Sequence, residues 1–114
     1  MEVILKNLEK INEIDNLDVY ILSLARSFII VEEKKQWLKK YAPFIREENY
    51  ILLNKENGDY NAENREFIKS IKMMEKLNEY DYVILLDDDH KILKRTLNEI
   101  GKNGEVFHVS SATM

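Results

Sequence analysis

The sequence feature that most constrains the fold is an apolar run over residues 82–86 (YVILL) that ends directly in three aspartates. An apolar run of this length without alternation is typical of a strand buried on both faces of a parallel sheet. Asp87, Asp88 and Asp89 then lie at the carboxyl end of that strand, which is the edge where open α/β sheets bind ligands. We therefore expect the chain to fold around this strand.

The three aspartates have two interpretations. Adjacent carboxylates repel one another unless a cation lies among them, and oxygen ligands suit a hard cation. Asp87 and Asp88 are therefore candidate ligands of Mg²⁺. Alternatively, the aspartates end the strand and cap the next helix, whose first turn favours negative charge. The sequence leaves both interpretations open.

Helical and strand patterns alternate along the chain. Apolar spacing predicts helices over residues 3–14, from Ser27 to about Ala42, from Phe67 to about Asn78, and around Ile92–Ile100, with Gly101 as a cap. Strands are predicted over residues 18–23, 49–53, 82–86 and 105–109. This order predicts a three-layer α/β sandwich with a mostly parallel, Rossmann-like sheet of about four strands, in a single domain over residues 1–114.

Composition excludes several classes of protein. The net charge of -4 argues against general binding to nucleic acid or to an anionic membrane surface. No stretch approaches the ~20 apolar residues of a membrane helix, and no signal-peptide pattern opens the chain. Without cysteine there is no disulfide framework and no thiolate metal site. We expect a cytoplasmic protein, with Lys34, Lys35, Lys39 and Lys40 on the solvated face of a helix.

Residues 19–23 (VYILS), 34–41 (KKQWLKKY) and 81–88 (DYVILLDD) together resemble the haloacid dehalogenase-like (HAD) superfamily of phosphohydrolases, and within it the 5′(3′)-deoxyribonucleotidase type. The first segment looks like the second motif of that family, in which Ser23 would hydrogen-bond the phosphoryl group. The next is similar to the lysine-tryptophan helix that follows it there. The last looks like the fourth motif, whose acids would hold magnesium.

The resemblance implies a site for a phosphate-containing small molecule or a nucleotide. Ser23 would donate to a phosphoryl oxygen, a lysine would offset its charge, and Mg²⁺ on Asp87 and Asp88 would complete an electrostatic cradle. Arg26 is a second candidate anion contact, and an ordinary surface charge is its alternative. No recognisable cap segment is present to select a substrate.

Lys69 is the expected lysine of the third family motif, because it precedes the body of a predicted helix. If that helix already begins near Asn61, Lys69 would face solvent, and Lys55 or Lys72 would take its place. His90 and His108 lie in different predicted elements without metal-ligand spacing, so both are expected to be structural.

The resembled family has a further strand followed by Asp-x-Asp, which carries its nucleophile, and this chain has no such strand ahead of Ser23. Covalent catalysis needs a positioned nucleophile, so we do not expect the chain to catalyse hydrolysis alone. In the family that strand lies between the Ser23 and Asp87 strands. Here these two strands are expected either to pair directly or to be completed by a partner chain, because open strand edges attract another strand.

Three hypotheses of function follow. The first is a HAD-like domain that binds magnesium and a phosphate or nucleotide without hydrolysing it alone. The second is a degenerate HAD-like interaction or regulatory module that self-associates or binds a protein through its sheet edge. The third is an active phosphatase with Asp87 or Asp88 as nucleophile. It ranks last because these acids match metal ligands and no second acid is placed for proton transfer.

Overall fold

The structure is a computed structural model that describes residues 2–13 and 17–109. The chain divides into two compact units, residues 1–60 and residues 61–114, which are described here one at a time. Helix and strand alternate four times, as the sequence predicts, with two additional short 3₁₀ helices. Within the described ranges, no helix is long and apolar enough to cross a membrane. A single domain over residues 1–114 stays a prediction.

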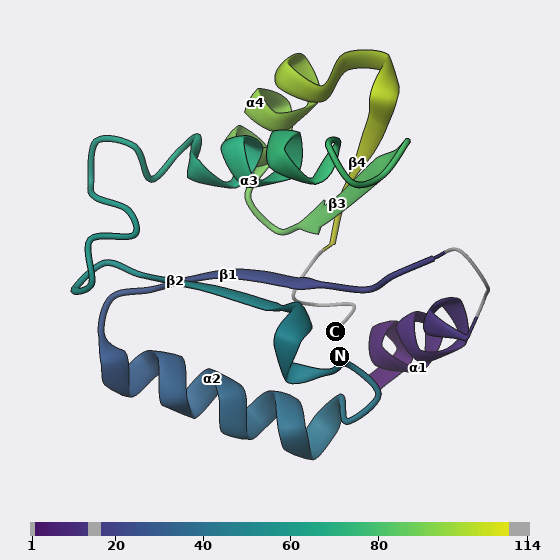
Figure 1. The fold of residues 1–114 in the computed structure, drawn as a ribbon, viewed down its shortest axis with the longest axis vertical. Helices are drawn as coiled ribbons and strands as arrows, with labels where there is room; N and C mark the ends of the chain where they lie inside the picture. The colour runs from purple at the N-terminus through teal and green to yellow at the C-terminus, as the bar shows by residue number, and fades with distance from the viewer. Residues whose placement is uncertain (1, 14–16, 110–114) are drawn as a thin grey trace. The chain divides into compact units, whose positions relative to one another are not determined.

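The first unit is a parallel βαβ arrangement preceded by a helix. Its elements are α1 (Glu2–Asn12), β1 (Ile21–Ala25), α2 (Phe28–Tyr41), the 3₁₀ helix η1 (Glu47–Asn49) and β2 (Tyr50–Asn54). β1 pairs in parallel with β2, and α2 forms the crossover between them (Figure 1). The core of this unit consists of Val19, Leu38, Ala42 and Ile45, with Leu8, Ile21, Phe44 and Tyr50 packed against it.

Both ends of α2 follow from local sequence. Ser27 has an extended backbone, and its Oγ accepts a hydrogen bond from the Ile30 N–H at 3.4 Å, so it is the predicted N-cap. The helix ends at Tyr41, with Ala42 as its C-cap, because a residue before Pro43 is disfavoured in helical geometry. Tyr41, the last residue of the helix, is 48% exposed.

The second unit repeats the βαβ plan with a preceding helix. Its elements are α3 (Ile68–Lys76), β3 (Val83–Asp87), α4 (His90–Ile100), the 3₁₀ helix η2 (Gly101–Asn103) and β4 (Gly104–His108). β3 pairs in parallel with β4, and α4 contacts α3 and both strands (Figure 1). Gly101 ends α4 with φ +57°, as predicted for its cap.

β3 is buried on one face only, in contrast to the expectation of two buried faces. Val83, Leu85 and Asp87 are buried, whereas Ile84 is 53% and Leu86 42% exposed. α3 and α4 contact β3, and Ile92 and Leu93 of α4 are among the buried side chains of this unit. The apolar run therefore predicted the strand correctly but not its environment.

The strands form two parallel sheets of two strands each, in the order β1-β2 and β3-β4. The mixed α/β class and the parallel pairing agree with the sequence prediction. A single four-stranded sheet is not shown by these pairings. The two outcomes expected for the missing strand, direct pairing of the Ser23 and Asp87 strands or completion by a partner chain, stay predictions.

Gly104 is required where β4 lies close to β3. A Cβ at this position would clash with the Val83 carbonyl oxygen and would lie 2.6 Å from Ile100 Cδ1. We expect Gly104→Ala to lower the free energy of unfolding by about 2 kcal/mol, because the strand must shift to admit the methyl group. Urea unfolding followed by circular dichroism measures this. In the control Gly58→Ala, a Cβ meets nothing within 4 Å, so only the backbone strain of φ +82° remains, about 1 kcal/mol. Equal losses would contradict the close-approach argument.

Thr96 carries a buried hydroxyl in α4 that is unsatisfied. The residue is 0% exposed, and its Oγ1 has no hydrogen-bond partner in the described part of the chain. We expect Thr96→Val to raise the free energy of unfolding by about 1 kcal/mol, because valine keeps the shape and removes the desolvated hydroxyl. Thr96→Ala is the matched control and should destabilise through the cavity it leaves. A destabilising Thr96→Val would show that the hydroxyl is bonded in solution.

Candidate functional site

The centre of the candidate site in the second unit is a buried ion pair at the end of β3. Asp87 is the last residue of the strand, and its side chain is 6% exposed. Its Oδ2 accepts a hydrogen bond from Lys69 Nζ at 2.5 Å, and its Oδ1 accepts one from the Asp89 N–H at 3.0 Å. Both carboxylate oxygens are therefore engaged by donors of the chain itself.

These contacts determine the ionisation of Asp87. Burial raises the pKa of a carboxyl group, because it disfavours the charged form. The Lys69 ammonium and the Asp89 N–H outweigh this effect and hold the pKa of Asp87 below its ordinary value. Asp87 is therefore a carboxylate at neutral pH, and the lysine compensates its charge.

Lys69 reaches Asp87 because α3 begins late. The helix starts at Ile68, not near Asn61, so Lys69 lies in its first turn and its side chain is 12% exposed. The alternative of a solvent-facing Lys69 is therefore wrong. Of the two reserve lysines, Lys72 pairs with Glu75 at 3.4 Å within the same helix. Lys55 is exposed in the turn after β2.

The other two aspartates differ in role. Asp88 is exposed, directly beyond the end of β3. Asp89 is the N-cap of α4, and its Oδ1 accepts hydrogen bonds from the Lys91 N–H at 2.9 Å and the Ile92 N–H at 3.2 Å. The capping interpretation of the acidic cluster therefore holds for Asp89, and Asp88 is the carboxylate that faces solvent at this edge.

His90 and His108 form a stacked pair that the sequence did not reveal. Their ring centroids lie 3.9 Å apart and the ring planes differ by 4°. The pairing register places His108 opposite Asp87, and His90 begins α4 after the Asp89 cap. The two rings meet through the register of β3 against β4, which cannot be derived from residue spacing within one element.

Magnesium fits this edge only together with a ligand. Among residues whose side chains are described, no group of three or more His, Cys, Asp and Glu is arranged to hold a metal ion. Asp87 also shares its oxygens with Lys69 and Asp89. Mg²⁺ often binds through one or two carboxylates plus substrate phosphates. Asp88, with the remaining lone pairs of Asp87, matches that small donor set but not a dedicated all-protein site.

Ser23 lies within β1 and not at its end as predicted, because the strand continues to Ala25. Lys34 of α2 donates to Ser23 Oγ at 2.6 Å and to the Leu24 carbonyl at 2.5 Å. Lys34 is half-buried, so its assignment to the solvated face of the helix is wrong. The ammonium occupies a lone pair of the Ser23 hydroxyl and leaves the O–H able to donate elsewhere.

The β1–α2 connection carries Arg26 and the start of α2. Arg26 is exposed, consistent with either of its two interpretations. The Phe28 N–H at the first turn of α2 donates to Glu56 Oε2 at 3.0 Å. Glu56 follows Asn54, whose Oδ1 accepts the Glu56 N–H at 3.0 Å. An internal carboxylate thus already binds this helix N-terminus, and the sequence analysis did not single out Glu56.

The predicted site residues are divided between the two units. Ser23 and Arg26 belong to the first unit, whereas Lys69, Asp87 and Asp88 belong to the second. Within the second unit the structure brings Lys69 and Asp87 into direct contact. Within the first, it adds Lys34 to Ser23.

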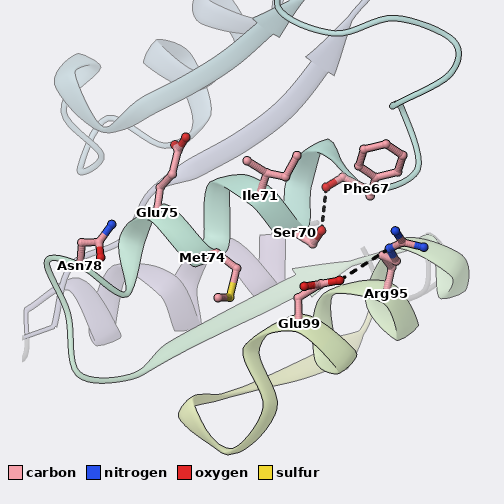
Figure 2. A pocket seen from close by; sticks show the side chains of 8 residues that line it. All are labelled: Phe67, Ser70, Ile71, Met74, Glu75, Asn78, Arg95 and Glu99. Atoms are coloured by element: carbon pink, nitrogen blue, oxygen red, sulfur yellow. Dashed lines mark hydrogen bonds and ion pairs between the residues drawn. The ribbon is translucent and has the colours of Figure 1, made fainter.

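The second unit also has a groove of about 450 Å³ between α3 and α4 (Figure 2). Phe67, Ile71 and Met74 line it together with polar side chains, and the Arg95 guanidinium lies 5.1 Å from the Phe67 ring centroid. Arg95 Nε is also 4.0 Å from Glu99 Oε1. None of the predicted site residues lines this groove, so it is a feature separate from the strand end.

Comparisons of the chain with models of known families, with curated proteins and with solved structures find no match.

Removal of Lys69 should destabilise the second unit through Asp87. We expect Lys69→Met to lower the free energy of unfolding at pH 7 by about 3 kcal/mol, because it leaves a buried carboxylate without its cation. The exposed pair of Lys39 and Glu47, 2.9 Å apart, supplies the control, and Lys39→Met should change the free energy of unfolding far less than Lys69→Met does, because solvent screens an exposed pair. Chemical unfolding of each variant measures the loss.

The loss in Lys69→Met should shrink on acidification. In the wild type the pKa of Asp87 is lowered, so its contribution is present above the unfolded pKa of about 3.9 and disappears as pH falls through the folded value. In the variant, burial without the ammonium shifts the pKa of Asp87 upward, so protonation on acidification relieves part of the cost. A loss independent of pH would contradict the assignment to Asp87.

Proposed function

We propose that this chain is a HAD-like domain that binds a phosphate or nucleotide together with Mg²⁺ and does not hydrolyse it alone. The observation that carries the proposal is the buried Lys69–Asp87 pair at the carboxyl end of β3, followed directly by the exposed Asp88. This is the edge of parallel α/β sheets at which ligands bind. In this proposal the two strand pairs belong to one Rossmann-like sheet of three-layer type.

Each side chain has a physical role in such binding. Lys69 supplies positive charge beside the carboxylates, so an anionic ligand is less strongly repelled there. Asp88 contributes an oxygen to a magnesium ion whose other ligands include phosphate oxygens and water. Ser23 offers its O–H as a donor, because Lys34 already engages the hydroxyl as an acceptor. Arg26 adds an exposed cation to the loop after β1.

The same contacts argue against hydrolysis by Asp87. A nucleophilic carboxylate must approach phosphorus, whereas both oxygens of Asp87 are hydrogen-bonded to Lys69 and Asp89. Asp89 is in turn occupied as the cap of α4, so it is a poor proton donor to a leaving group. An active phosphatase with Asp88 as nucleophile therefore remains the weakest of the three hypotheses.

Thermal melting with Mg²⁺, with phosphate, and with both together tests the proposal. We expect a substantial shift only with both, because the protein alone supplies few magnesium ligands. A ligand at about 100 times its dissociation constant stabilises by ~2.7 kcal/mol, which is several degrees in a domain of this size. The Asp88→Asn variant should lose the shift and keep its fold, since Asp88 is exposed.

Asp81→Asn is the matched control, because Asp81 is an exposed carboxylate at the opposite end of β3. It should melt and respond to the ligands as the wild type does. No shift in the wild type, or equal loss in both variants, contradicts the proposal. Turnover of a generic phosphate ester that Asp88→Asn abolishes would favour the phosphatase hypothesis instead.

One observation favours a second candidate function, that of an interaction module which self-associates or binds a protein through a sheet edge. β1 and β3 each pair with one strand only among the described residues. All-parallel sheets usually occur with more strands and with both faces covered. An edge left open in this way is a common surface for adding a strand from another chain.

A further inference from the structure

The edge of β3 that faces away from β4 offers backbone groups for another strand. The Val109 N–H donates to the Asp87 carbonyl at 3.0 Å, so the groups of Asp87 point toward the β4 side. Backbone direction alternates along a strand, so those of Ile84 and Leu86 point to the opposite side. Within the second unit, over residues 61–109, no backbone hydrogen bond from another element reaches these two residues there.

The corresponding edge of β1 is closed by a lysine. The Lys55 N–H donates to the Ala25 carbonyl at 2.9 Å, so by the same alternation the Leu24 carbonyl points away from β2. Lys34 Nζ donates to that carbonyl at 2.5 Å. Lysine on an edge strand is a common device against pairing with another chain. Residues 82–86 (YVILL) contain no charged residue and no proline, so β3 has no such protection.

The side chains of this edge are apolar and accessible. Ile84 is 53% exposed and Leu86 42%. In the parallel register Leu86 lies opposite Phe107 of β4, which is 49% exposed, so both point to the same face. Ile84 lies opposite Glu105 on that face. A strand added beside β3 would therefore gain backbone hydrogen bonds and apolar neighbours together.

The sequence of β3 is complementary to itself in antiparallel orientation. In the register centred on Leu85, the five residues of β3 overlap fully and Ile84 lies opposite Leu86 of the partner subunit. Both residues point their backbone groups toward the added strand, as a hydrogen-bonded pair requires. Asp87 then lies opposite Val83 of the partner subunit. A register centred on Ile84 would instead place Asp87 opposite Asp81 of the partner subunit, and like charges directly opposite are unfavourable.

We propose that two copies of this chain associate through antiparallel pairing of their β3 edges, in the register centred on Leu85. The pairing is isologous and closes as a twofold dimer, the commonest symmetry of homo-oligomers. It joins two sheets of two strands into one of four, in the order β4-β3-β3-β4. This inference rests on the second candidate function and gives it a surface and a partner; it does not depend on phosphate binding. It uses the β3 edge at which a single four-stranded sheet would join the two strand pairs, so it is an alternative to that sheet.

Sedimentation of the full chain over a range of concentrations tests the association. The wild type should reach a dimer, and Ile84→Lys and Leu86→Lys should each raise the dissociation constant at least tenfold by placing charge at the pairing edge. Ile29→Lys is the control, because Ile29 is 69% exposed and lies on helix α2 of the first unit. It should dimerise as the wild type does. Circular dichroism confirms that each variant is folded.

Cross-linking tests the register, and the absence of native cysteine makes single-cysteine variants clean probes. In the proposed register the Cα atom of Ile84 in one subunit lies about 5.5 Å from the Cα atom of Leu86 of the partner subunit, which is within reach of a disulfide. Equal residues of the two subunits lie roughly 8 to 9 Å apart, which is too far. A mixture of Ile84→Cys and Leu86→Cys should therefore form disulfide-linked dimers faster than either variant alone.

The outcomes separate the inference from the candidate function on which it rests. A wild type that stays monomeric at every concentration overturns the dimer. A dimer that persists in both lysine variants overturns the β3 edge but leaves an interaction module with another surface. Cross-links that form equally well in a single variant and in the mixture overturn the register.

Discussion

The carboxylate of Asp87 is the interaction on which the second unit depends. Its side chain binds Lys69 of α3 and the Asp89 N–H at the start of α4, and its backbone carbonyl accepts from Val109 after β4. One residue thus connects two helices and the strand pair. A buried carboxylate is costly unless it is paired and hydrogen-bonded. The Lys69–Asp87 ion pair therefore holds α3 against β3 in addition to the apolar packing between them.

In each unit a lysine on a helix donates hydrogen bonds to residues of a strand, with different consequences. Lys69 neutralises a buried carboxylate and leaves the edge of β3 unpaired. Lys34 binds a hydroxyl and a carbonyl and so closes the edge of β1 at Leu24. The same residue type therefore supports a candidate anion site in one unit and limits strand addition in the other. Ligand binding at the strand ends and association at the β3 edge use different surfaces of the second unit.

Local sequence determined the elements and their caps. Ser27 and Asp89 each offer an oxygen to the N–H groups of a helix start, and Gly101 permits the positive φ at a helix end. These depend on contacts within a few residues, so they are readable from the chain. The choice of Lys69 over Lys55 and Lys72 came from a resemblance to a family. The ion pair with Asp87 agrees with that choice, while the family itself and the bound ligand stay proposals.

By itself, the sequence determined the alternation of helix and strand, the parallel α/β class and the presence of acids at the end of β3. Only the tertiary structure decided which partners these groups have. The register of β3 against β4 stacks His90 on His108, and the course of α2 over β1 brings Lys34 to Ser23. The tertiary structure also leaves Ile84 and Leu86 half exposed, although the apolar run of residues 82–86 predicted a strand buried on both faces. Such contacts join residues distant in the chain, and their energies depend on the choice of strand partners. The periodicity of apolar residues does not encode that choice.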